Sequence, residues 1–236
     1  MSSKENSLDK FQERVGVNFN NKELLRQAFV HRSYINENRN SSLEHNERLE
    51  FLGDAVLELV ITDYLFHKYP KKPEGELTSL RAALVNTYSL HQVAKSLEVN
   101  GELYLSKGEA KDTGRAREFI LANTVEALIG AIYLDQGYQE AKRFIEQFIS
   151  VRIDEVIEEK LWIDAKSHFQ EKAQEMVSET PVYKVLEEKG PDHDKSFVSG
   201  VFLGDELIAS GEGHSKQEAE QQAARQALEK KGWDQS

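Results

Sequence analysis

Three acidic residues in the first half of the chain are spaced so that a helix would place them on one face. Glu47, Glu50 and Asp54 recur every three or four positions in the stretch HNERLEFLGDAVLEL, residues 45–59. On a helix such residues lie one above another. Because stacked like charges repel, a partly buried column of carboxylates calls for something that offsets the repulsion.

A second segment carries oxygen ligands of the same kind. In LANTVEALIGAIYLD, residues 121–135, Asn123 and Glu126 are one helical turn apart. If the two predicted helices pack together, carboxylate and amide oxygens from both converge. All-oxygen ligand sets suit Mg²⁺ or Mn²⁺ rather than zinc, so the two segments together could hold a divalent cation.

A solvated acidic helix face is the simpler interpretation of this spacing, and periodicity alone favours it. Two features favour the metal site instead. Glu47, Glu50 and Asp54 stand among Leu and Phe rather than among lysines. Gly53 falls inside the predicted helix, where glycine costs about 0.5–1 kcal/mol relative to alanine, which indicates close approach of another backbone.

The elements that would position these residues are helices. Apolar residues recur at helical spacing in five segments, 22–34, 46–69, 76–97, 116–135 and 138–160. Turn-forming Pro, Gly, Asn and Asp residues separate these segments. The first 160 residues are therefore predicted to form an all-α domain.

From Asp164 the pattern changes. KSHFQEKAQEMV predicts a helix, the alternating segments PVYKVLEEK, KSFVSGVFLG and ELIASGEG predict three antiparallel strands, and SKQEAEQQAARQALEKKG predicts a closing helix. Ser215 and Glu218 at the start of that helix have the spacing of a capping box. Residues 164–236 are therefore predicted to be a small α+β domain of order αβββα.

Composition predicts a soluble cytoplasmic protein without membrane association. The chain has 236 residues and no cysteine, no apolar run long enough to span a bilayer, and no secretion signal at its start. Its net charge of −11 argues against a nucleic-acid partner, which usually leaves a basic footprint.

Several motifs nevertheless match one enzyme family in content and in order. HNERLEFLGDA resembles the signature of the bacterial ribonuclease III family, and FVHRSY, EGELTSLRAALV and ANTVEALIGAIYLDQG are similar to the family's other landmarks. GPDHDKSF and SKQEAEQQAARQAL resemble parts of a double-stranded RNA-binding domain. The resemblance covers essentially the whole chain, and the string NERLEFLGD is highly specific.

The resemblance implies a homodimeric endoribonuclease that cuts double-stranded RNA with a divalent metal. Magnesium is the expected ion, with manganese able to take its place. The products would carry 5′-phosphate and 3′-hydroxyl ends with short 3′ overhangs. Processing of ribosomal and messenger RNA would be expected from the family.

By the same resemblance, Glu50, Asp54 and Glu126 fall on the family's metal-binding carboxylates, and Asp54 and Glu126 are the expected catalytic pair. Asn123 occupies a ligand position where the family commonly has Asp. An amide oxygen can still bind magnesium, but without a formal charge. Asn123 is the one feature that favours an alternative, a catalytically impaired protein that holds duplex RNA without cutting it.

Three further residues are assigned through the resemblance. Glu47 and Glu74 match auxiliary acidic positions near the cleft. Phe51 matches an aromatic residue that protrudes into a socket on the partner subunit, which predicts a dimer axis beside the active site. From helical spacing alone, packing of Phe51 in the core is an equal alternative.

The expected RNA contacts lie in the second domain. Gln170 and Glu171 match positions that touch 2′-hydroxyls across the minor groove. His193 and Lys195 lie in the loop between the first two strands, and Lys216 begins the last helix, where free N–H groups favour phosphate.

The charge of this domain conflicts with RNA binding. Residues 164–236 hold 9 Lys or Arg against 15 Asp or Glu. The family's adjacent lysines at the last helix are reduced here to Lys216. We therefore expect weak RNA binding by this domain alone.

Overall fold

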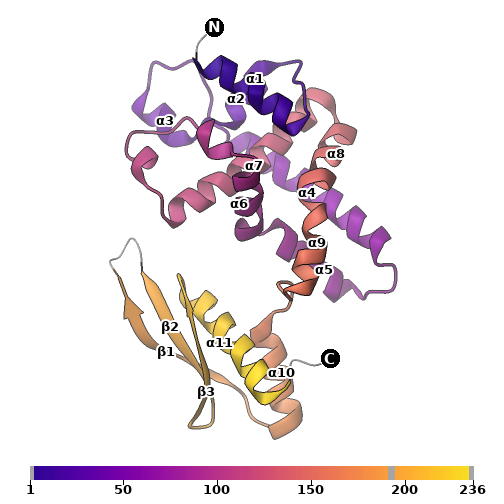
Figure 1. Ribbon diagram of the computed structural model, residues 1–236, viewed down its shortest axis with the longest axis vertical. Coiled ribbons are helices and arrows are strands. Elements are labelled where there is room, and N and C mark those ends of the chain that lie inside the picture. The colour runs from indigo at the N-terminus through magenta and orange to yellow at the C-terminus, as the bar shows by residue number, and fades with distance from the viewer. Residues whose placement is uncertain (1–2, 191–194, 234–236) are drawn as a thin grey trace. The chain divides into compact units, whose positions relative to one another are not determined.

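The computed structural model describes residues 3–190 and 195–233 (Figure 1). The chain divides into two compact units, Met1–Trp162 and Ile163–Ser236, each with its own apolar core. Among the described residues, the helices are all too short or too polar to cross a membrane.

The first unit is helical. Its α-helices are α1 (Ser3–Val15), α2 (Lys22–Ala28), α3 (Arg32–Glu37), α4 (Glu47–Lys68), α5 (Glu74–Val85), α6 (Thr87–Ser96), α7 (Arg115–Gln136), α8 (Tyr138–Phe148) and α9 (Ile153–Glu158). Short 3₁₀ turns are η1 (Val99–Gly101), η2 (Glu109–Lys111) and η3 (Ser150–Arg152). The helices α4 and α7 are the longest and pack against each other, and α7 is buried around most of its circumference between Ile120 and Ile132.

Three predicted helices are interrupted in the structure. The predicted helix 76–97 is divided at Asn86, whose side chain accepts a hydrogen bond from the Ser89 backbone and caps α6. The predicted helix 22–34 is divided where Val30 forms a parallel bridge with Tyr104. The segment 138–160 is divided by η3.

The second unit has the predicted order αβββα. It consists of α10 (Ala165–Val177), β1 (Val182–Lys189), β2 (Ser196–Leu203), β3 (Glu206–Gly213) and α11 (Lys216–Lys231). The sheet is antiparallel with order β1-β2-β3. Both helices lie on one side of the sheet (Figure 1). The predicted fold class, an all-α domain followed by an α+β domain, is confirmed.

Close helix–sheet packing in this unit depends on small residues. A Cβ atom on Gly211 would lie 2.2 Å from the backbone nitrogen of Ala223, and alanines occupy the buried side of α11. Because neither surface carries a bulky side chain there, α11 lies directly against β3.

Candidate functional site

The central helices α4 and α7 touch backbone to backbone at two glycines. A Cβ atom on Gly53 would lie 1.8 Å from the carbonyl oxygen of Glu126, and one on Gly130 would lie 2.2 Å from that of Leu49. Any side chain at either position would push the helices apart. The close approach predicted at Gly53 is confirmed, and the structure adds Gly130 as its counterpart on α7.

This crossing brings the predicted oxygen ligands of the two helices together. Glu50 and Asp54 come from α4, and Asn123 and Glu126 come from α7. The Asn123 side-chain nitrogen Nδ2 donates a hydrogen bond to Glu50 Oε1 at 2.9 Å. Glu126 is near enough to both Asp54 and Glu50 for their charges to act on its pKa.

The electrostatics at the crossing disfavour negative charge. Burial, followed by the nearby charges of Asp54 and Glu50, raises the pKa of Glu126 to about 8. Burial also raises the pKa of Glu50, and the charges of Glu47 and Asp54 add to the effect while the hydrogen bond from Asn123 opposes it. A bound cation would remove the cost of ionising these carboxyls, so the donor set fits a divalent metal.

The side chains do not, however, surround one point. Within residues 3–190 and 195–233, no three His, Cys, Asp or Glu side chains are grouped as metal ligands. Glu50 instead uses one oxygen to accept the Asn123 hydrogen bond. The structure therefore places the four expected ligands at one helix crossing without arranging them as a closed cluster.

The start of α4 is fixed by a buried residue that the sequence did not reveal. The Asn46 backbone nitrogen donates to the carbonyl oxygen of Val30 at 2.9 Å, and its side-chain nitrogen donates to that of Ala28 at 3.0 Å. An Asn just before a helix suggests an N-cap, but this side chain makes no cap hydrogen bond. It ties the first turn of α4, which carries Glu50, to the segment that follows α2.

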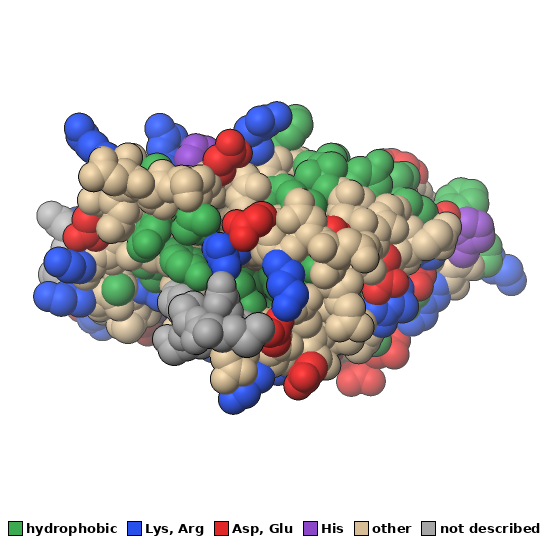
Figure 2. Space-filling view, turned by 90° about the horizontal axis from the view of Figure 1, so that it is seen from above, with side chains coloured by type: hydrophobic (Ala, Val, Ile, Leu, Met, Phe, Trp, Pro, Cys, Tyr) green, Lys and Arg blue, Asp and Glu red, His purple; other side chains and the backbone are tan. Residues whose placement is uncertain are grey.

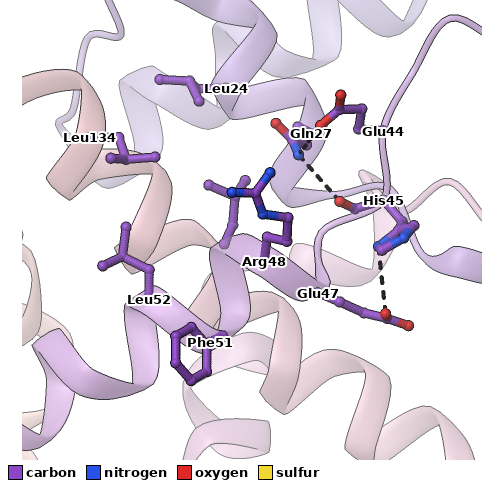
Figure 3. Close-up of a pocket in the computed structure, with 10 residues that line it drawn as sticks. Leu24, Gln27, Glu44, His45, Glu47, Arg48, Phe51, Leu52 and Leu134 are labelled. Atoms are coloured by element: carbon purple, nitrogen blue, oxygen red, sulfur yellow. Dashed lines mark hydrogen bonds and ion pairs between the residues drawn. The ribbon is translucent and has the colours of Figure 1, made fainter.

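The two residues expected to be auxiliary acids make contacts with residues other than these four. Glu47 is paired with Arg32 at 3.4 Å and lies 3.7 Å from His45 Nδ1 (Figure 3). Glu74 begins α5 and accepts a hydrogen bond from Thr78 at 3.0 Å within the same helix.

Phe51 projects from the first unit beside a surface hollow. Its side chain is 81% exposed, which excludes the alternative of core packing within this chain. The hollow has a volume of about 570 Å³ (Figure 3). Phe51 itself lines one side of the hollow, and the rest of the lining combines leucines with polar side chains, namely Leu24, Leu49, Leu52, Leu134, Gln27, Glu44, His45, Glu47 and Arg48.

In the second unit, the described residues of the expected RNA-binding set are exposed or, for Lys195, partly exposed. Gln170 and Glu171 are exposed on α10, and Lys216 is the first residue of α11. Lys195 lies directly before β2, whereas His193 lies outside the described residues. Half of the predicted capping box is present, because Ser215 Oγ accepts a hydrogen bond from the Glu218 backbone at 3.2 Å. The Glu218 side chain accepts from the backbone nitrogen of His214, at 2.9 Å, rather than from that of Ser215.

A carboxylate missed in the sequence contacts two of these basic residues. Glu188 of β1 lies 3.3 Å from Lys216 Nζ through Oε1 and 3.9 Å from Lys195 Nζ through Oε2. Glu188 thus offsets Lys195 and Lys216 locally, in addition to the acidic excess of the whole unit. On the face of the molecule drawn in Figure 2, basic and acidic side chains are interspersed rather than separated.

Comparison with known proteins covers both units. Residues 21–153 match a family model described as "Ribonuclease-III-like", and residues 165–231 match the "Double-stranded RNA binding motif". A protein of Desulforamulus reducens named Ribonuclease 3 is 44% identical over 97% of this chain and 93% of its own length. A protein of Bacillus cereus with the same name is 49% identical over 93% of this chain and 89% of its own length.

The first unit also matches solved structures of nuclease domains. The crystal structure of the nuclease domain of ribonuclease III from Campylobacter jejuni is 40% identical with a TM-score of 0.55, covering 61% of this chain and 94% of that one. A second structure of that domain is 41% identical with a TM-score of 0.54, and the match covers 61% of this chain and 99% of that one. Its description mentions structural flexibility in a region involved in dimer formation.

Proposed function

The chain belongs to the ribonuclease III family, endoribonucleases that act on double-stranded RNA, and we propose that it cuts each strand at the α4–α7 crossing. The cut is a hydrolysis that leaves 5′-phosphate and 3′-hydroxyl ends with short 3′ overhangs. Precursors of ribosomal RNA and structured messenger RNA are the proposed substrates.

The proposed cofactor is Mg²⁺, with Mn²⁺ as a substitute. Glu50, Asp54 and Glu126 would hold it through carboxylate oxygens, and Asn123 through its amide oxygen. The observation that supports this proposal most strongly is the meeting of these four side chains at the α4–α7 crossing. Burial and the neighbouring carboxylates raise the pKa of Glu126 there, and a nearby cation would stabilise its anion. When bound, the ion lowers the pKa of water and offsets charge that develops on the phosphate.

The side chains at and near the crossing have distinct proposed roles. Asp54 of α4 and Glu126 of α7 are the proposed indispensable pair, one carboxylate from each of the two crossing helices. Asn123 positions Glu50 through the 2.9 Å hydrogen bond. The proposed auxiliary acids, Glu47 and Glu74, add negative charge at the edge of the site.

We propose that the protein acts as a twofold homodimer in which Phe51 enters the hollow of the partner subunit. The exposed ring and the leucine-lined hollow lie on the same face (Figure 3). A twofold axis through such a face matches each ring to the other subunit's hollow. Because Phe51 follows Glu50 directly, the axis would lie beside both active sites, which suits a duplex with two strands to cut.

The second unit is proposed to hold the duplex by its A-form shape. Gln170 and Glu171 would meet 2′-hydroxyls in a minor groove, while Lys195, His193 and Lys216 would meet phosphates. Lysine and helix N–H groups together favour phosphate at the start of α11.

Asn123 supports a second candidate, an RNA-binding protein that does not cut. Incubation of the purified protein with long duplex RNA and magnesium separates the two, with Asp54→Ala as the control. Cleavage by the wild type and none by the variant supports the enzyme. Tight binding without cleavage by the wild type would favour the second candidate.

A further inference from the structure

Glu188, Phe197 and Gly213 form one row across the sheet of the second unit. Glu188 of β1 pairs with Phe197 of β2, and Phe197 pairs with Gly213 of β3. A Cβ atom on Gly213 would lie 2.7 Å from the backbone nitrogen of Ala219, so the glycine lets the first turn of α11 approach the sheet. This row therefore lies next to the helix start that carries Lys216.

Lys216 extends over this row. Its Nζ lies 5.6 Å from the centroid of the Phe197 ring, a cation–π distance, and 3.3 Å from Glu188 Oε1. The second oxygen of the same carboxylate, Oε2, faces Lys195 Nζ at 3.9 Å. One carboxylate thus bridges two basic side chains that come from different parts of the chain.

A phosphodiester would make the same kind of contacts. It also presents two unesterified oxygens that share one negative charge, and it could bridge two ammonium groups in this way. Without RNA, the Glu188 carboxylate occupies the position that such a bridge requires.

We infer that Glu188 is an internal competitor for RNA phosphate, which holds Lys195 and Lys216 until the duplex displaces it. The inference rests on the proposed function, since it takes these two lysines as RNA contacts. Side-chain exposures of 41% for Glu188 and 58% for Lys216 make the contact exchangeable, because exposed ion pairs contribute only about 0–1 kcal/mol. Glu188 therefore lowers RNA affinity without blocking binding.

The effect has an expected size and salt dependence. Removing the charge of Glu188 removes its attraction for Lys195 and Lys216 and its repulsion of the incoming phosphate. We expect about fivefold tighter RNA binding at roughly 50 mM salt. The gain should largely disappear near 0.5 M salt, where exposed charges are screened over about 4–5 Å.

The test compares Glu188→Gln with Glu187→Gln in the full chain. Glu187 is adjacent on β1 and pairs with Lys189 at 2.9 Å, so its variant has the same change in net charge without touching Lys195 or Lys216. Binding of a labelled duplex RNA of about 30 base pairs, roughly two domain spans, is measured in EDTA to prevent cleavage. Thermal unfolding confirms that each variant is folded, and Glu188→Ala serves as a second variant.

At low salt, both Glu188 variants are expected to bind the duplex more tightly than the wild type. Glu187→Gln is expected to bind like the wild type. The gain should also shrink when Lys216→Gln is combined with Glu188→Gln. Equal affinities for Glu188→Gln, Glu187→Gln and wild type would overturn the competitor role while leaving the proposed function intact. If the wild type did not bind the duplex at any salt, both would be overturned.

Discussion

Burial and its acidic neighbours raise the pKa of the Glu126 carboxyl to about 8, which favours its protonated form at neutral pH. A divalent cation that binds there must displace this proton. At pH 7 we therefore expect magnesium binding to release close to one proton per site. Above pH 8 the release should decline, because Glu126 is then already ionised, and the apparent affinity for magnesium should level off.

Calorimetric titration in two buffers with different ionisation enthalpies measures this release. Glu126→Gln should bind magnesium more weakly and release fewer protons at pH 7 than the wild type does. Proton release that was the same at pH 6.5 and pH 9.5 would contradict the assignment of this proton to Glu126.

Asn123 affects the same site through its lack of charge. Replacing it by Asp adds a fourth carboxylate and removes the hydrogen bond to Glu50. We expect Asn123→Asp to tighten magnesium binding by on the order of tenfold, since one more opposite charge acts at short range. The magnesium dependence of cleavage by the two proteins measures the change, and identical midpoints would exclude it.

At the level of the elements, the glycines at the α4–α7 crossing determine how closely the ligand-bearing helices approach. Gly130→Ala places a methyl group where the structure has the Leu49 carbonyl oxygen, so the helices must separate. We expect a loss of about 1–3 kcal/mol or more in unfolding free energy, measured in urea. Magnesium binding should weaken as well, because Asn123 and Glu126 move away from α4.

Gly75→Ala is the matched control for this change. Gly75 is also helical, in α5, but a Cβ atom there would meet nothing within 4 Å. This substitution should be neutral or should stabilise the protein by about 0.4–1 kcal/mol. Equal effects at Gly75 and Gly130 would show that helix propensity, not the crossing, determines the cost.

The helices also show which parts of the fold can be predicted from the sequence alone. Apolar spacing predicts α4 and α7 well, since each has a long run of residues facing one core. Three of the predicted helices are divided in the structure. One break is set by a contact distant in sequence, the Val30–Tyr104 bridge, and another by the Asn86 cap. These contacts have no period, so periodicity cannot reveal them.

The same limit applies to the site. The spacing of Glu50, Asp54, Asn123 and Glu126 suggests convergence, but the Asn123–Glu50 hydrogen bond requires both helices in place. Glu188 is still harder to find, because three strands and a helix must assemble before it meets Lys195 and Lys216. In the sequence it is one of many acidic residues on an acidic domain.

For the whole molecule, the proposed assembly depends on a single exposed ring. Phe51 is 81% exposed, so its removal leaves the core of the subunit unchanged. Burying a Phe side chain contributes about 1.5–3 kcal/mol, and a twofold dimer buries two. Phe51→Ala should therefore weaken dimerisation by about 10²-fold to 10⁴-fold.

Sedimentation over a range of protein concentrations measures this change, and Phe66→Ala is the control. Phe66 lies on the same helix and is 65% exposed, but it does not line the hollow. Its loss should leave the dimer intact. A Phe51→Ala dimer as tight as the wild type would show that the subunits meet elsewhere. Paired cuts in the two strands would then need another explanation, since the dimer axis would not lie beside Glu50.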